Sequence, residues 1–320
     1  MTVAARSGTP AVHVDALVKR YDETAALDGV SVDVRSGELF GFIGPDGAGK
    51  TTLFRILVTL LLPDAGSAEV LGLDVARDPW ALRRRVGYMP GRFSLYPDLS
   101  VAENLDFFAS VFGTTPDAEM ATIAPIYRQL ASFADRRAGA LSGGMKQKLA
   151  LCCALVHRPE ILLLDEPTTG VDAVSRREFW DLLARLREGG LTIVVSTPYM
   201  DEAARCDRVA LIDRGRILAL DTPAAITAAF DRPLLAVRGA RRYDLLRATR
   251  DYVHTASAFP FGESLHVTDA RDTTSADRSA AELRAHLHAA GFADAVVEPT
   301  TPTIEDVFMA RMGAPAGSER

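Results

Sequence analysis

The segment Gly44–Thr52, GPDGAGKTT, constrains this chain more than any other stretch. It matches the pattern G-x-x-x-x-G-K-[ST] and stands between an apolar strand-like run, ELFGFI, and a helix-like run that begins at Lys50. Glycines let backbone N–H groups curl around phosphates, and the helix N-terminus adds its positive dipole end. Lys50 is placed to reach the β- and γ-phosphates of a nucleotide, and the Thr51 hydroxyl is placed to bind Mg²⁺. We therefore predict a phosphate-binding loop made of Gly44, Pro45, Asp46, Gly47, Ala48, Gly49, Lys50, Thr51 and Thr52.

Two acidic residues end a second apolar run, ILLLDEP, at Ile161–Pro167. A continuous apolar run of this length is typical of a buried parallel strand. Asp165 would hold Mg²⁺ through water, and Glu166 would polarise an attacking water as a general base. On their own, two acids at a strand end would more often only solvate it. Beside a phosphate-binding loop they predict a metal ligand and a catalytic carboxylate.

A third motif, LSGGM at Leu141–Met145, precedes a helical run that leads directly into ILLLDEP. Ser142 supplies a hydroxyl, Gly143 and Gly144 expose backbone N–H groups, and a helix N-terminus follows, which together make a second anion-binding nest. Ser142 is also suited to be the ordinary N-cap of that helix, and the two roles do not conflict.

The three motifs, in this order, resemble the nucleotide-binding subunit of an ABC transporter, and the resemblance covers about residues 11–230. It implies an α/β fold: a P-loop NTPase cassette with an antiparallel β subdomain and a helical subdomain at about residues 91–157. It also implies ATP and Mg²⁺ as ligands. The Ser142 nest is then expected to meet the γ-phosphate held by a second ATP-binding subunit, so that two ATP molecules join a head-to-tail dimer.

The same resemblance implies further residues and partners. Tyr21 falls where the family stacks an aromatic ring on adenine, although a surface tyrosine at a strand end is the simpler alternative. Asp172 matches the D-loop position. The helical subdomain is expected to receive a separate transmembrane permease, which places the chain peripherally on the cytoplasmic side of the membrane. The segment PTIEDVFMARMG is similar to ATPase subunits of two-component exporters of the antibiotic-efflux type.

Three positions depart from the family pattern. Gly91 stands where the Q-loop has a glutamine, Pro198 where the switch histidine contacts the γ-phosphate, and Asp46 where asparagine is commoner. We expect Thr197 to N-cap a helix with Pro198 at its first position. Three interpretations stay open: a slow homodimer, a subunit of a heterodimer whose partner has the competent site, or a subfamily that tolerates both changes.

Composition and the rest of the chain limit the alternatives. The net charge of −6 argues against nucleic acid as a partner, and therefore against the rival class, a soluble ABC ATPase acting on nucleic acid or ribosomes. The three cysteines have no CxxC spacing and indicate reduced thiols in a cytosolic protein. No apolar run approaches the roughly 18 residues that span a bilayer.

The remaining patterns predict local structure. A helix is expected from Lys50 to Leu62, ending at Pro63, and a capping box at Ser100 and Glu103 predicts another helix start. Beyond the cassette we predict a small C-terminal α+β domain at residues 231–311 and a disordered tail at 312–320.

Overall fold

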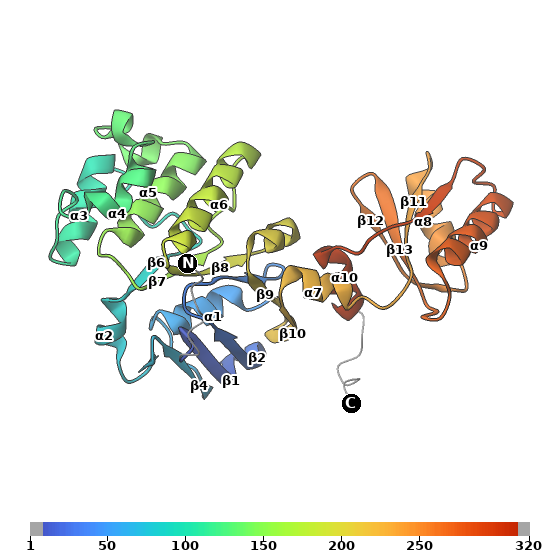
Figure 1. The fold of residues 1–320 in the computed structure, drawn as a ribbon, viewed down its shortest axis with the longest axis horizontal. Coiled ribbons are helices and arrows are strands. Elements are labelled where there is room, and N and C mark those ends of the chain that lie inside the picture. The colour runs from blue at the N-terminus through green and yellow to red at the C-terminus, as the bar shows by residue number, and fades with distance from the viewer. Residues whose placement is uncertain (1–8, 313–320) are drawn as a thin grey trace, which may run out of the picture. The chain divides into compact units, whose positions relative to one another are not determined.

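This computed structural model describes residues 9–312. The chain divides into two compact units, one ending at Pro223 and the other beginning at Ala224, and Figure 1 shows the elements of each. The division falls within helix α7 (Pro223–Ala228), a few residues before the boundary at 230–231 that the sequence predicts. The predicted tail lies outside the described residues, except for Met312, which ends helix α10 (Ile304–Met312).

A six-stranded sheet with the order β10-β9-β3-β8-β7-β6 forms the centre of the first unit. All neighbouring strands pair in parallel except β9 and β10, which are antiparallel. The continuous apolar runs of the sequence are its fully buried central strands, as expected for a parallel sheet covered on both faces. The strands are β3 (Leu39–Ile43), β6 (Val86–Met89), β7 (Ile161–Asp165), β8 (Thr192–Thr197), β9 (Arg208–Asp213) and β10 (Arg216–Asp221).

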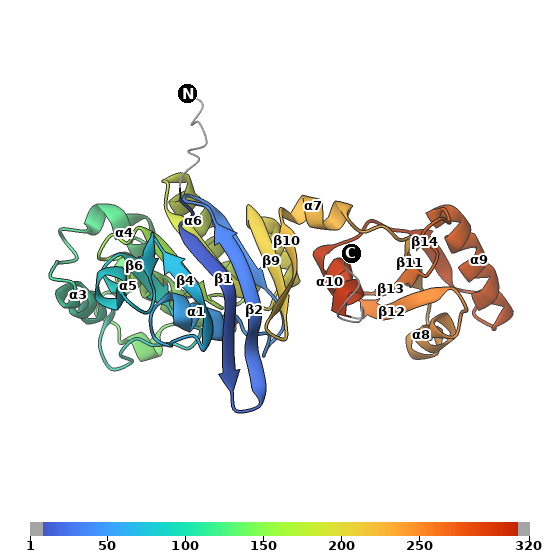
Figure 2. The same ribbon diagram turned by 90° about the horizontal axis from the view of Figure 1, so that it is seen from below.

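A second, antiparallel sheet has the order β2-β1-β4-β5 and confirms the predicted β subdomain. Helix α1 (Lys50–Leu57) lies between the two sheets, in contact with β2, β4 and β7 (Figure 2). A hydrophobic core cluster formed by both sheets and α1 fills this space. The strands are β1 (Val12–Tyr21), β2 (Thr24–Val34), β4 (Ala65–Val70) and β5 (Leu73–Asp74).

Helix α1 is shorter than the sequence predicts. It ends at Leu57, not at Leu62, because Thr59 adopts a left-handed conformation with φ 64°. The backbone N–H groups of Leu60 and Leu61 both return to the carbonyl of Arg55, which closes the helix before the proline is reached.

The predicted helical subdomain consists of α3 (Val101–Val111), α4 (Met120–Tyr127) and α5 (Gly143–Leu155), with short 3₁₀ turns between the last two. The capping box of α3 is confirmed: the Ser100 hydroxyl accepts from the Glu103 N–H, and the Glu103 carboxylate accepts from the Ser100 N–H. Helix α5 packs against α3, α4 and β6, while α6 (Ala173–Glu188) packs on β3 and β8. Helix α2 (Pro79–Arg83) precedes β6.

The second unit has the order β11-α8-β12-β13-α9-β14, with an antiparallel sheet ordered β12-β13-β11-β14. Helices α8 and α9 share one core with the sheet. Helix α10 is attached to β13 by a buried hydrogen bond of 2.7 Å between His266 Nδ1 and Asp306 Oδ1. The elements are β11 (Leu234–Arg238), α8 (Arg242–Arg250), β12 (Thr255–Phe261), β13 (Ser264–Asp269), α9 (Ala276–Ala289) and β14 (Val296–Pro299).

Two sequence expectations concern membranes and thiols. Among the described residues, no helix combines the length and the apolar character that crossing a bilayer requires. The cysteines Cys152, Cys153 and Cys206 are buried and free.

Candidate functional site

The loop Gly44–Gly49 joins β3 to α1 and is pressed against its neighbours at both ends. A Cβ atom on Gly44 would lie 2.0 Å from the Ile212 carbonyl oxygen, and one on Gly49 would lie 2.2 Å from that of Ala26. Gly49 also has φ 104°, a conformation that L side chains rarely adopt. Space therefore requires glycine at both ends, and at Gly49 the backbone conformation requires it as well.

Lys50 folds back over this loop. Its ammonium donates to the carbonyl oxygens of Gly44 and Pro45 at 2.8 and 2.9 Å, and its side chain is almost fully buried. The same Nζ lies 3.2 Å from Glu166 Oε1. The structure thus brings the loop lysine and the proposed catalytic carboxylate, 116 positions apart in the printed numbering, into one ion pair.

Asp165 and Glu166 follow each other at the end of β7. Asp165 is buried, accepts a hydrogen bond of 2.6 Å at Oδ1 from the Ser196 hydroxyl, and has no ion pair among the described residues. Buried carboxylates are usually paired with a cation or bound to a metal, so Asp165 fits the Mg²⁺ ligand that the sequence predicts. Glu166 adopts φ 50°, which is uncommon for a residue other than glycine.

The two positions without side-chain donors lie near different parts of the site. Gly91 follows β6, and a Cβ atom there would lie 3.1 Å from the Asp165 carbonyl oxygen and 3.7 Å from Glu166 Cβ. Pro198 follows Thr197, whose carbonyl accepts from the Gly44 N–H at 3.2 Å. Positions 91 and 198 therefore stand next to the carboxylates and to the loop, respectively.

The expected helix cap at Thr197 is wrong. The helix that follows is a 3₁₀ helix, η3 (Met200–Arg205), which begins two residues later and has Tyr199 as its N-cap. The Thr197 hydroxyl accepts from the Tyr199 N–H at 3.1 Å and donates to the buried carboxylate of Glu202 at 2.5 Å. Thr168 donates to the other oxygen of Glu202 at 2.9 Å, so a buried acid fixes this turn.

The LSGGM segment lies in a different environment. Ser142 caps α5, its hydroxyl accepting from the Met145 N–H at 3.4 Å, as expected for an N-cap. A Cβ atom on Gly144 would lie 2.5 Å from Ser175 Oγ, and one on Gly143 would lie 3.3 Å from the Gly170 carbonyl. The neighbours of this nest are therefore the start of α6 and the loop before it.

Asp172 is the N-cap of α6. Its carboxylate accepts from the N–H groups of Ser175 and Val174, and these hydrogen bonds, that from Ser175 first, lower the pKa of Asp172. The predicted D-loop residue thus has a local structural role next to the LSGGM nest.

The other predicted ligands lie around the loop. Thr51 and Thr52 begin α1 and are half-buried, whereas the Asp46 side chain is exposed. Tyr21 ends β1 opposite Thr24 of β2 and is 45% exposed. Because the Ala26 carbonyl of β2 lies against Gly49, this hairpin borders the loop, and the partly exposed Tyr21 is available for stacking.

Sequence reasoning missed three residues of this site: Ser196, Glu202 and Thr168. The hydroxyl of Ser196 within a buried apolar run is a signal that the sequence offers. Its partner Asp165 cannot be identified without knowing that β8 lies next to β7. Glu202 reads as an ordinary surface acid in PYMDEA, and nothing in that pattern predicts that it is buried.

Comparison with known proteins finds a matching family and similar sequences. The family described as ABC transporter matches residues 27–169. The chain is 38% identical over 316 residues to the probable multidrug ABC transporter ATP-binding protein YbhF of Escherichia coli (strain K12), covering 96% of this chain and 53% of that protein. It is 45% identical over 208 residues to the Nod factor export ATP-binding protein I of Burkholderia pseudomallei (strain 1710b), covering 64% of this chain and 68% of that protein. The chain thus spans about half the length of YbhF.

Solved structures agree. The chain is similar to cbiO1 from Clostridium perfringens, part of the ABC transporter complex cbiONQ, with TM-score 0.62 and 27% identity over 69% of this chain and 92% of that one. It is also similar to the ATP-binding cassette MJ0796 in a dimeric post-hydrolysis state bound to ADP and Pi, with TM-score 0.59 and 26% identity over 66% of this chain and 98% of that one. The chain belongs to the ATP-binding proteins of ABC transporters.

Proposed function

We propose that this chain is the ATP-binding and ATP-hydrolysing subunit of an ABC exporter and powers a separate membrane permease. One observation carries the proposal: the Lys50 ammonium, which folds over the loop Gly44–Gly49, lies 3.2 Å from Glu166, and Glu166 directly follows the buried Asp165. The exporter assignment is supported by the relatives, which are named for multidrug transport and Nod factor export.

The residues divide the chemistry among them. Thr51 and Asp165 would hold Mg²⁺, which supplies charge neutralisation on the phosphates when bound. When ATP enters, its phosphate oxygens become partners of Lys50 and compete with Glu166 for the ammonium. Glu166 is then free to orient water as the general base. Tyr21 offers a ring to the adenine, and Asp46 keeps its charge in solvent.

A second ATP-binding subunit completes the site in this proposal. The Ser142 nest can bind a phosphate through glycine N–H groups and the N-terminus of α5. The Ser142 hydroxyl accepts a hydrogen bond from the Met145 N–H of that helix. A phosphate held by another chain suits it, and a dimeric relative of known structure supports such an arrangement. The partner is a second copy or a different subunit.

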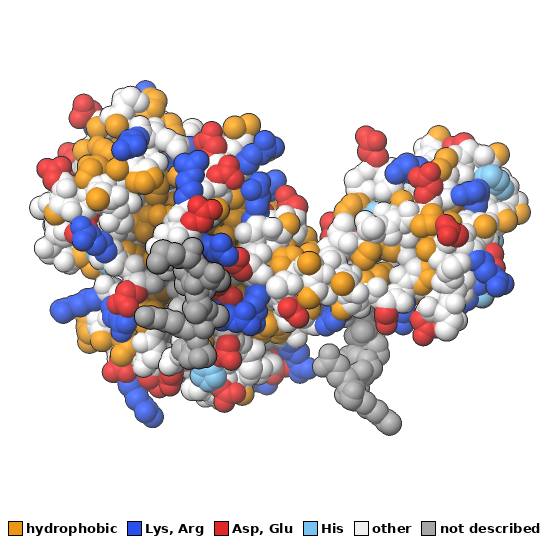
Figure 3. Space-filling model, viewed as in Figure 1, with side chains coloured by type: hydrophobic (Ala, Val, Ile, Leu, Met, Phe, Trp, Pro, Cys, Tyr) orange, Lys and Arg blue, Asp and Glu red, His pale blue; other side chains and the backbone are white. Residues whose placement is uncertain are grey.

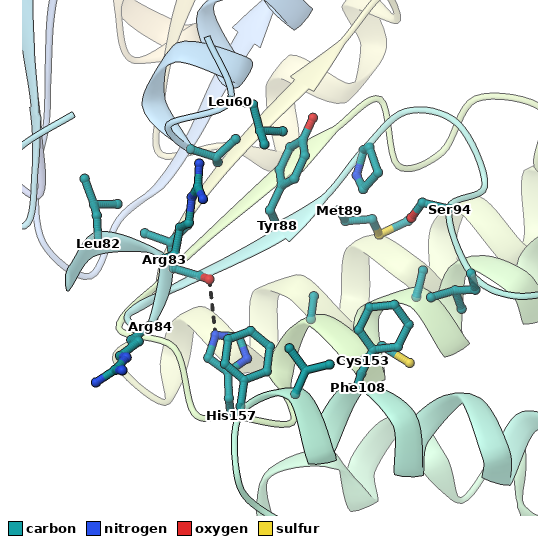
Figure 4. A pocket seen from close by; sticks show the side chains of 18 of the residues that line it. Leu60, Leu82, Arg83, Arg84, Tyr88, Met89, Ser94, Phe108, Cys153 and His157 are labelled. Atoms are coloured by element: carbon teal, nitrogen blue, oxygen red, sulfur yellow. Dashed lines mark hydrogen bonds between the residues drawn. The ribbon is translucent and has the colours of Figure 1, made fainter. Parts of the chain in front are cut away.

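A groove in the first unit is suited to the permease. Its volume is about 960 Å³, and its lining combines β6, the end of α3 and the helix α5. Leu60 and Tyr88 lie at one side, and Phe108, Cys153 and His157 at the other (Figure 4). Trp80 and Val111 on its rim are 76% and 61% exposed. Hydrophobic side chains also show among charged ones over α3, α4 and α5 (Figure 3), and exposed apolar patches of this kind mark interaction sites.

Phosphate release by the purified chain tests the proposed activity. Glu166→Gln should abolish slow Mg-ATP turnover because the base is lost. Glu160→Gln makes the same change at the exposed residue before β7, where Glu160 pairs with Arg85, and should leave turnover intact. Turnover that survives Glu166→Gln would refute the assignment of the base.

Membrane fractionation of cells that contain the permease tests the peripheral placement. The chain should sediment with membranes and be released by carbonate. Val111→Asp should leave it in the supernatant, whereas Val253→Asp, at a valine 81% exposed in the second unit, should not. Resistance to carbonate, as shown by integral proteins, would contradict the proposal.

A regulatory subunit with little turnover is the second candidate. Gly91 and Pro198 favour it, because neither position bordering the carboxylates and the loop carries a side-chain donor. In that case ATP would bind as an adhesive between subunits, and the Ser142 nest would complete the partner's competent site. The C-terminal unit, predicted at residues 231–311, is proposed as an accessory domain in either case.

A further inference from the structure

Ser196 is a polar residue in a fully buried strand of the cassette, β8. All six residues of β8 are buried, and Ser196 itself is 0% exposed. A hydroxyl at such a position is costly unless it is hydrogen-bonded. The strand lies between β3, which leads into the loop, and β7, which ends in the two carboxylates.

The Ser196 hydroxyl uses both of its hydrogen-bonding capacities on those carboxylate residues. It donates to Asp165 Oδ1 at 2.6 Å and accepts from the Glu166 N–H at 3.0 Å. The Ser196 carbonyl also accepts from the same N–H at 3.0 Å. The parallel register, which pairs Asp165 with Ser196, brings these groups together.

Each contact restrains one acid in a different way. The bond to Oδ1 prevents the Asp165 carboxylate from turning about its Cβ–Cγ bond without losing a buried partner. The bonds to the Glu166 N–H stabilise the left-handed φ of 50° from which this side chain reaches Lys50. Such a backbone conformation persists only where the surroundings enforce it.

We propose that Ser196 is the positioning residue of the hydrolytic centre: it orients Asp165 toward the metal and Glu166 toward the attacking water. The inference rests on the proposed ATP site and adds a residue to it. Pro198, two residues later and just beyond β8, has no side-chain donor, whereas Ser196 offers its hydroxyl to Asp165.

Metal affinity, measured apart from turnover, tests the proposal. The purified chain is loaded with the ATP analogue AMP-PNP, and Mn²⁺ binding is followed by electron paramagnetic resonance. Ser196→Ala should weaken Mn²⁺ binding by about tenfold or more, the range for lost partners of metal ligands, while AMP-PNP affinity in EDTA changes by less than about threefold. Ser196→Thr, which keeps the hydroxyl, should restore the metal affinity.

A matched control separates position from burial. Thr192, at the other end of β8, is also buried and accepts from the Gly37 N–H at 2.9 Å. Thr192→Val removes a buried hydroxyl from the same strand, and it should lower the melting temperature without changing Mn²⁺ affinity. If Ser196→Ala does not fold, Ser196→Cys keeps the volume, replaces the donor with a weak one, and should show the same loss.

Two outcomes overturn the inference: wild-type Mn²⁺ affinity in the folded Ser196 variants, or an equal loss in Thr192→Val. A wild-type chain that binds Mn²⁺ and AMP-PNP but releases no phosphate would contradict the proposed hydrolysis. The contribution of Ser196 would still be decided by the binding measurement.

Discussion

Side-chain donors restored at positions 91 and 198 should accelerate ATP turnover. The perturbation is the double change Gly91→Gln with Pro198→His. A single well-placed donor to the developing charge contributes on the order of 10²–10³ in rate. Binding should change little, because the loop and Lys50 supply most of it.

The structure reduces the expected gain. The new Cβ at position 91 would lie 3.1 Å from the Asp165 carbonyl oxygen, closer than ordinary contact, so the neighbouring backbone must give by a few tenths of an ångström. Overpacking of this kind costs on the order of 1–3 kcal/mol, which offsets roughly ten- to hundredfold in rate. Replacing Pro198 adds some flexibility to the turn, although the bond from the Tyr199 N–H to Thr197 remains. Because crowding opposes only the donor at position 91, the pair should still increase turnover by at least about a hundredfold.

Steady-state phosphate release with matched controls measures this gain. Gly91→Ala adds the crowded Cβ without a donor, and Pro198→Ala removes the ring without adding one, so their combination should be no faster than wild type. The reasoning is refuted if the folded Gln/His variant is no faster than the Ala/Ala variant. It is equally refuted if the wild-type chain turns over briskly alone and stops on Glu166→Gln.

Three further predictions concern the interface, the buried acid and acid stability. Ser142→Arg should block dimerisation induced by AMP-PNP in light scattering while monomer affinity stays the same; equal losses would place Ser142 in its own chain's site. Glu202→Gln should destabilise the chain by about 1–3 kcal/mol in urea unfolding, because two buried hydroxyls lose their anionic acceptor; no change would mean that the turn is held otherwise. Burial raises the pKa of Asp269, but the hydrogen bonds from Arg271 outweigh it and lower the pKa to about 2. Because the folded pKa lies below the unfolded one, this stabilisation, about 2 kcal/mol, is present above about pH 4 and lost toward pH 2, and Asp269→Asn should remove that part of the pH dependence of unfolding.

The sequence predicts the elements that rest on local rules. The glycines of the loop, the apolar run ending in Asp165 and the capping box at Ser100 each carry their signal within a few residues, and the structure has the corresponding strand, loop and helix starts. The α/β core follows from the alternation of such signals.

What the sequence does not predict either has no local signal or depends on distant parts of the chain. Helix α1 ends at Leu57 because Thr59 turns left-handed, which no breaker residue announces. The strand β12 contains Pro260, which argues locally against a strand but is accommodated because β12 lies at the edge of its sheet. The contact of Ser196 with Asp165 requires β8 to lie next to β7, and chain order does not reveal that adjacency.

Titration calorimetry of Mg-ATP binding tests the nucleotide site most directly. Lys50→Ala removes the ammonium that the structure places over the loop, and hydrogen bonds to a charged group contribute about 1.5–3 kcal/mol, so affinity should fall by about tenfold to hundredfold. Lys148→Ala, at a buried lysine paired with Glu178 at 2.6 Å on another helix, should bind as wild type does. Equal affinity in the Lys50 variant and the wild-type chain would contradict the claim that this loop is an ATP site.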